Sequence, residues 1–136
     1  MTGFAAEALQ KGVYQLLTGN ALLVSGVAGI HDQPDEKAAL PMVVIGDATV
    51  ADNSTKTHEG QAFTLTLHAW SEAAGRMEVK RVMGLVFDAL QNASITLDGH
   101  ALIQLHFDFA EDFRERLGPR TLYHGVMRFR ALTQRL

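Results

Sequence analysis

The chain has 136 residues, of which 47% are hydrophobic, and its formal net charge is −3. This length and composition predict one globular domain spanning residues 1–136 and exclude a disordered chain. The absence of cysteine excludes a disulfide framework, a thiolate metal site and a cysteine nucleophile. The mildly acidic charge gives no electrostatic reason to expect nucleic acid or an anionic membrane as the main partner.

The first residues, MTGFAAEALQKG, lack the basic stretch and apolar run of a signal peptide. No segment approaches the roughly 20 apolar residues that a membrane-spanning helix needs. We therefore expect a protein that is made and used, or assembled, inside a cell, without a membrane partner.

A helix is predicted from Phe4 to Leu17, where apolar residues recur every three or four positions and Gly19 follows as a stop. A short turn is expected over residues 21–24 and a short edge strand over residues 30–34. The β-branched run from Pro41 to Asp47 predicts a buried strand, ended by the Gly-Asp pair at 46–47.

The stretch from Thr49 to Gly60 is rich in Asp, Asn, Ser, Thr and Gly, which predicts a loop. It joins two predicted strands, so we expect an extended hairpin whose tip projects from the body. Loops of about a dozen residues in compact domains are often functional. A disordered, solvated loop is the other interpretation that the sequence leaves open.

The segment Gln61–Ser71 alternates apolar and polar residues, which predicts a strand with one apolar face. From Glu72 to Leu90 the apolar residues step by three or four, which predicts a helix with Ser71 as a plausible N-cap. The short link suggests that this helix folds back over the apolar face of the strand.

Near the C-terminus, Asp98-Gly99 separates two alternating runs, at residues 94–97 and 101–109, and predicts a type I′ hairpin. A charged connector is expected over residues 111–119, followed by a last strand from Arg120 to Thr133. Short links between strands predict an α+β fold: a mostly antiparallel β-sheet with two main α-helices packed on one face.

The chain has six histidines, without the spacing of a known metal motif. His68, His106 and His124 lie on the polar side of predicted strands and could be neighbours there with Asp108, or could simply face solvent. The sequence also lacks a nucleophile elbow, a phosphate-binding glycine loop and a catalytic pair of carboxylates. We therefore predict no catalytic residue, no metal and no cofactor.

Basic and aromatic residues raise the question of a subunit contact. Arg76, Lys80 and Arg81 crowd the start of the second helix and form either an exposed face or an ion-pair surface between subunits. Arg128 and Arg130 on the last strand pose the same choice. Trp70 on the polar side of its strand indicates a second buried face, either within the chain or in an oligomer.

Four blocks of the sequence resemble a tail-completion family of long-tailed phages and gene transfer agents: IGD at 45–47, STKTHEGQAFTLTLHAWS at 54–71, GRMEVKRVM at 75–83 and HGVMRFRALT at 124–133. The resemblance implies a tail terminator with a small α+β fold. Such a protein forms a ring, typically of six subunits, which caps the tail tube and offers its other face to the head-side connector. Assembly would use complementary surfaces, without a reaction or a cofactor.

The resemblance also implies where the protein acts. It would assemble in the cytoplasm and end in the neck of the particle, with DNA passing through the ring without specific binding. The candidate contact loop for the tube or connector is Asp52, Asn53, Ser54, Thr55, Lys56, Thr57, His58 and Glu59. The candidate subunit-interface residues are Trp70, Arg76, Arg81, Arg128 and Arg130.

Two alternatives remain open from the sequence. One is a stopper or adaptor of the same neck. The other is a small ligand-binding or enzymatic α+β domain that uses the histidine-bearing sheet face, and it predicts a concave pocket with convergent polar groups.

Overall fold

The computed structural model describes residues 2–136. In chain order, the elements are α1 (Ala6–Thr18), α2 (Ala21–Gly26), β1 (Gly29–His31), β2 (Met42–Asp52), β3 (Gly60–Ser71), α3 (Met77–Leu90), β4 (Thr96–Leu97), β5 (His100–Leu117) and β6 (Arg120–Arg135). The six strands form one sheet in the order β1-β2-β3-β6-β5-β4. The β1–β2 pair is parallel and the other neighbouring pairs are antiparallel.

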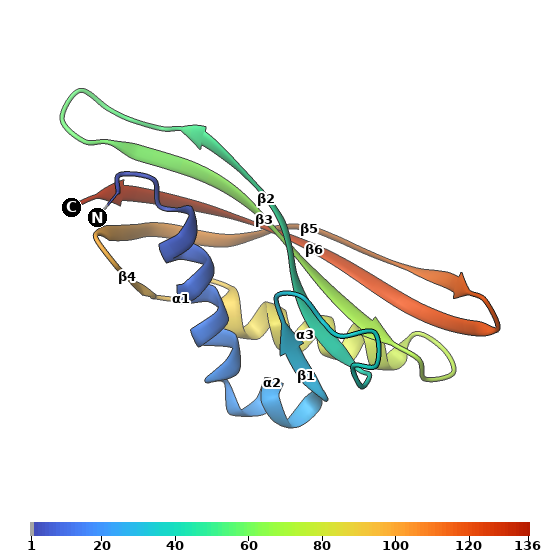
Figure 1. Cartoon of the computed structure of the whole chain (residues 1–136). Coiled ribbons are helices and arrows are strands. Elements are labelled where there is room, and N and C mark those ends of the chain that lie inside the picture. The colour runs from blue at the N-terminus through green and yellow to red at the C-terminus, as the bar shows by residue number, and fades with distance from the viewer. Residues whose placement is uncertain (1) are drawn as a thin grey trace.

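The helices lie on one face of this sheet, which twists so strongly that the β2–β3 and β5–β6 hairpins cross in Figure 1. Alternation along the strands directs one set of side chains toward the helices, and these make the core. Its fully buried members include Leu9, Val13, Leu67, Val79, Val82, Val86 and Phe129. The predicted fold class, a mostly antiparallel sheet with two main helices on one face, is confirmed.

The face opposite the helices, which we call the open sheet face, is not uniformly exposed. Thr64, Thr66 and Arg128 lie on it in the middle of the sheet, where side chains are half-buried or exposed. Toward the β5–β6 turn, His124 and Val126 are buried on this face. Strand β6 therefore has buried side chains on both faces near the β5–β6 turn.

The strand predicted to end at Gly46-Asp47 continues to Asp52, so that prediction is wrong. A bulge between Ile45 and Ala48 absorbs the extra residue, and pairing with β3 resumes beyond it. A side chain at Gly46 would collide with the His68 imidazole, because its Cβ would lie 2.5 Å from Nε2. The loop predicted from residue 49 therefore comprises only residues 53–59, which we call the hairpin tip.

The charged connector predicted over residues 111–119 is also wrong. Residues up to Leu117 belong to β5 and pair with β6, and only Gly118 and Pro119 form the turn. Charged residues are tolerated in this strand because the side chains of Glu111, Arg114 and Arg116 remain exposed. Together the β5–β6 hairpin and the hairpin tip extend the sheet at opposite ends (Figure 1).

Two local predictions need correction. Helix α3 begins at Met77 rather than Glu72, and its N-cap is Arg76 rather than Ser71. The hydroxyl of Ser71 instead accepts from the Ala73 amide and donates to Glu78. The Asp98-Gly99 hairpin is present, but of the pair only Gly99 has positive φ, so the turn is not type I′.

The N-terminal predictions are close to the observed elements. The turn expected at 21–24 is the helix α2, whose first turn is capped by the Asn20 side chain accepting from the Leu23 amide. The short strand is β1, three residues long. Within residues 2–136, no helix combines the length and apolar character that crossing a membrane requires.

Candidate functional site

The hairpin tip is held by its own hydrogen bonds rather than by packing. The Asn53 amide donates to the Gly60 carbonyl at 2.8 Å, and the Thr55 amide donates to the His58 carbonyl at 2.8 Å. The Ser54 hydroxyl donates to the Asp52 carboxylate at 2.7 Å and accepts from the Gly60 amide at 3.1 Å. These bonds form because Asp, Ser and Thr side chains compete well for backbone groups in turns.

The base of the tip is tied to the end of the chain. Arg135 contacts Glu59 twice, through its backbone amide at 2.9 Å and through a guanidinium–carboxylate pair at 3.1 Å. The side chains of Thr55, Lys56 and His58 beyond this anchor are exposed. The tip is therefore a structured polar projection with exposed side chains at its end.

A histidine-centred cluster occupies the buried end of the open sheet face. The His124 ring stacks on Trp70, with centroids 3.8 Å apart, and meets the edge of Phe113 at 4.9 Å. Its Nε2 lies 2.7 Å from Nδ1 of His68, and its Nδ1 lies 3.0 Å from a Glu115 oxygen. We call these five residues the His124 cluster.

Burial holds the pKa of His68 below its ordinary value, and the neighbouring His124 lowers that pKa further. His68 is half-buried, and a charged imidazolium there would lose hydration. The cluster offers proton donors and acceptors but contains no Ser, Thr or Cys nucleophile. Its stacked, edge-to-face and hydrogen-bonded contacts are those of a structural core.

The histidines predicted as possible neighbours are only partly together. His68 and His124 meet, but His106 bonds the Gln104 side chain and Asp108 pairs with Arg130 at 3.3 Å. Among residues 2–136, no three His, Asp or Glu side chains are grouped closely enough to hold a metal ion.

The candidate interface residues do not form one surface. Arg76 and Arg81 lie on the helix side: Arg76 pairs with Asp112 at 3.4 Å and covers the Tyr123 ring, and Arg81 donates to the Gly26 carbonyl. On the open sheet face, Trp70 belongs to the His124 cluster and Arg130 pairs with Asp108. Arg128 is exposed and lies over the Phe109 ring, 5.6 Å from its centroid.

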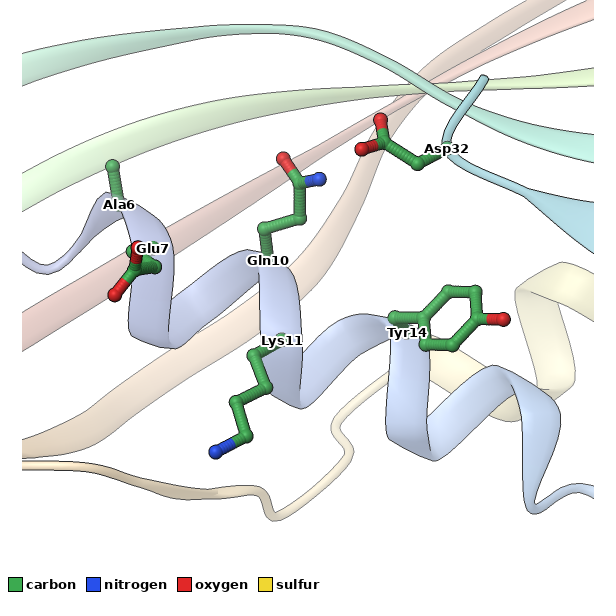
Figure 2. Close-up of a pocket in the computed structure, with 6 residues that line it drawn as sticks. All are labelled: Ala6, Glu7, Gln10, Lys11, Tyr14 and Asp32. Atoms are coloured by element: carbon green, nitrogen blue, oxygen red, sulfur yellow. The ribbon is translucent and has the colours of Figure 1, made fainter. Parts of the chain in front are cut away.

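A groove of about 520 Å³ runs along the outer side of α1 and is lined by Ala6, Glu7, Gln10, Lys11, Tyr14 and Asp32. Figure 2 shows that its polar groups do not converge: Lys11 points away from Asp32, and its ammonium pairs with Asp98 at 3.2 Å. We call this feature the α1 groove. It lies on the helix side and not on the histidine-bearing sheet face that the enzymatic alternative would use.

The sequence predictions missed Glu115 and Phe113, because both lie in the segment assigned to a connector. No alternation of apolar and polar residues marks this segment as a strand, because Phe109 and Phe113 are four residues apart with charged residues between them.

The comparisons with known proteins agree with this fold. A family model described as "Tail completion protein gp17" matches residues 11–134. The tail completion protein gp17 of Bacillus phage SPP1 is 25% identical over 126 residues, which are 93% of this chain and 92% of that protein.

Two solved structures are similar over nearly the whole chain. A chain in the structure titled "Virion of native gene transfer agent (GTA) particle" is 30% identical, with a TM-score of 0.85 and coverage of 98% of this chain and 99% of its own. The structure of bacteriophage SPP1 gp17 is 22% identical, with a TM-score of 0.58 and coverage of 96% and 95%. At that identity the second likeness shows the fold alone.

Proposed function

This chain belongs to the tail completion protein gp17 family, and we propose that it is a structural component of the head–tail junction of a phage-like particle. In this proposal it forms a ring of six copies that caps the tail tube, stops its growth and joins it to the head connector. The family is one of structural tail-completion proteins and not an enzyme family.

One observation carries the proposal: the chain resembles, from end to end, a chain found in a gene transfer agent virion. An identity of 30% and a TM-score of 0.85 leave little of this chain outside the shared fold. The chain therefore has the same arrangement of strands, helices and hairpins available for a similar assembly. The parent particle in this proposal is therefore a gene transfer agent or a long-tailed phage.

The geometry supports assembly by complementary surfaces. The hairpin tip projects as an ordered polar element, and its exposed side chains Thr55, Lys56 and His58 suit a contact with the tube or connector protein. Arg128 on the open sheet face is a candidate subunit or lumen residue, because it has no carboxylate partner among residues 2–136. In this arrangement DNA crosses the ring without specific binding.

Deletion of the gene from a particle-producing strain tests the proposed function. We expect full heads without attached tails, together with tails of irregular length, because nothing would stop tube growth. Expression of the wild-type chain in trans should restore joined particles. Joined particles with uniform tails in the deletion strain would contradict the proposal.

The same experiment separates the terminator from the stopper or adaptor alternative. A stopper acts on the head side, so its loss leaves tails of uniform length that do not join heads. Irregular tails therefore support the terminator, and uniform unjoined tails support the stopper or adaptor.

A further inference from the structure

Both long outer strands of the sheet have stretches without a partner strand. β1 pairs with β2 only at Met42–Val44, so the outer edge of β2 from Ile45 to Asp52 is unpaired. On the other side, β4 pairs with β5 only at His100 and Ala101, and the Gln91 side chain bonds the Phe107 amide. The edge of β5 from Phe109 to Leu117 is left without a partner within residues 2–136.

Free edges of this length present unmet backbone donors and acceptors, and proteins normally cover or disrupt them. The two stretches have similar lengths and run in opposite directions, because β2, β3, β6 and β5 alternate in direction across the sheet. A second copy placed beside the first in the same orientation would therefore bring its β5 antiparallel to β2. Antiparallel pairing is the ladder that such strands already form elsewhere in this sheet.

We propose that neighbouring copies of this chain join head to tail by pairing the β2 edge at Ile45–Asp52 of one copy with the β5 edge at Phe109–Leu117 of the next. The inference rests on the proposed function, since it identifies the contact that closes the ring. The contact is heterologous, with different surfaces on each side, as a closed ring requires.

The surroundings of the two edges are complementary in charge. Arg114 and Arg116 point to the helix side of β5 and are exposed, and no carboxylate pairs with them among residues 2–136. The β2 edge is flanked on its helix side by the α1 groove, whose acids Glu7 and Asp32 are likewise without a basic partner in that range. In the joined edges, the two arginines extend over α1 toward these acids, which Figure 2 shows along the groove.

An apolar crevice lies directly beneath the same edge. It runs between α1 and the edge, and Leu9, Val13, Ile45 and Phe63 are among the residues that line it. The added strand would cover the mouth of this crevice. Backbone pairing and the burial of apolar surface are the two contributions that stabilise strand addition to a sheet edge.

The positions of the two edges also fix the tilt of the strands. Across the sheet Phe113 is level with Met42, through the pairs Phe113–His124, His124–Trp70 and Trp70–Met42. The centre of the free β2 edge lies about five residues beyond that level, which is roughly 17 Å along the strands. The four strands of one copy are about 19 Å wide across the sheet. A neighbouring copy is therefore displaced by both distances, and in a flat ring this displacement tilts the strands by about 40° from the ring axis, within the range of closed barrels.

These offsets give a ring of plausible size. The spacing between copies is about 25 Å, so six copies form a ring of roughly 25 Å radius at the sheet. Side chains about 5 Å deep then leave an opening of roughly 40 Å, which admits a DNA duplex. With the helices on the outside of the ring, the open sheet face points inward, and Thr64, Thr66 and Arg128 line the opening.

Cross-linking tests the edge contact, because the natural chain has no cysteine. In the Ala48→Cys/Arg114→Cys variant, both thiols lie on the helix side of the joined edges and are far apart within one copy. A bis-maleimide of about 10 Å spans a register difference of two residues, roughly 7 Å. Purified particles carrying this variant should give a ladder of cross-linked species up to six copies.

Matched controls define the kind of contact. Ala48→Cys and Arg114→Cys alone should not cross-link, whereas a symmetric contact would link one of them into dimers and overturn the inference. Ala48→Cys/Asp88→Cys places the second thiol on the exposed side of α3, away from both edges, and should remain monomeric. Absence of the ladder from particles that contain the double variant also overturns the inference and leaves the proposed function standing.

Hydrogen exchange on the wild-type protein covers the case in which the variants fail to assemble. The amides of residues 45–52 and 109–117 should exchange at least tenfold more slowly in particles than in the isolated chain. Equal exchange in both states overturns the edge contact. If immunoblots find no wild-type chain in intact particles, the proposed function itself fails, so the two failures are distinguishable.

Discussion

At the residue scale, the His124 cluster links stability to pH. The pKa of His68 is below its ordinary value of 6.5 in the folded chain, because burial disfavours the imidazolium. The unfolded chain therefore binds more protons near and below pH 6.5 than the folded chain, and stability rises with pH there. Stability is fully present above the unfolded pKa and is lost as pH falls through 6.5 toward the folded value.

We expect a lower melting temperature at pH 5.5 than at pH 7.5. The unfolding free energy should change by at most about 1.4 kcal/mol per pH unit, because one proton is involved. His68→Gln should flatten that slope, and His58→Gln in the exposed hairpin tip should not. Differential scanning calorimetry at both pH values measures the effect. An unchanged slope in His68→Gln would show that this residue does not carry the pH dependence.

Two glycines give opposite predictions for the same substitution. A Cβ at Gly60 would lie 2.7 Å from the Asn53 carbonyl oxygen and 3.0 Å from that of Thr133, and both are backbone atoms that cannot move alone. Gly60→Ala should therefore cost about 1–3 kcal/mol of unfolding free energy. Gly84, within α3, has no heavy atom within 4 Å of a Cβ, and Gly84→Ala should stabilise by about 1 kcal/mol.

Urea denaturation of both variants measures these changes against the wild type. The pair also tests the geometry of the hairpin base, since only a closed β2–β3 turn crowds Gly60. A Gly60→Ala chain as stable as the wild type would mean that the backbone around Asn53 is looser than the structure has it.

At the element scale, the hairpin tip can be altered without loss of the fold. Thr55→Ala, Lys56→Ala and His58→Ala together remove exposed side chains beyond the Glu59–Arg135 anchor. Their combined cost in stability should be about 1 kcal/mol, chiefly because the Thr55 hydroxyl accepts hydrogen bonds from the Thr57 and His58 amides. Incorporation into particles should nevertheless fall at least tenfold, as measured by immunoblot of purified particles.

The matched control for this triple variant is Glu36→Ala/Lys37→Ala, which also removes exposed charge but lies in the connection between β1 and β2. It should enter particles normally. Normal incorporation of the triple variant as well would show that the hairpin tip does not contact a partner.

The elements that the sequence predicts well are those with one buried face. The alternation over residues 61–71 predicts β3 because only one side meets the helices, and the stripe from Val79 to Leu90 predicts α3 for the same reason. The prediction fails for a charged segment that was assigned to a loop but forms a strand. Residues 111–117 are strand, since their charged side chains reach solvent from an edge.

The candidate surfaces were less predictable, because they depend on register. Strand parity brings His68 and His124 to one face, but the register between β3 and β6 decides that their rings meet. No pattern in the sequence reveals that register, and Glu115 was missed because its segment was assigned to a connector. The unpaired lengths of β2 and β5 likewise follow from where β1 and β4 end.

At the scale of the whole molecule, the fold places different surfaces in different directions. The hairpin tip projects along the strands, the β2 and β5 edges face sideways, and the helices cover one face (Figure 1). A ring component needs this division, since lateral contacts close the ring while axial contacts reach the layers above and below. We therefore predict a ring whose hairpin tips all project from the same side, inclined to its axis by the same angle as the strands.

Cryo-electron microscopy of intact particles is the most direct test of this central claim. We predict one ring of six copies at the head–tail junction, directly on the last ring of the tail tube, with tilted strands around the opening. A ring nearer the portal would instead identify a stopper or adaptor. Intact, fully joined particles without density for this chain would contradict the account.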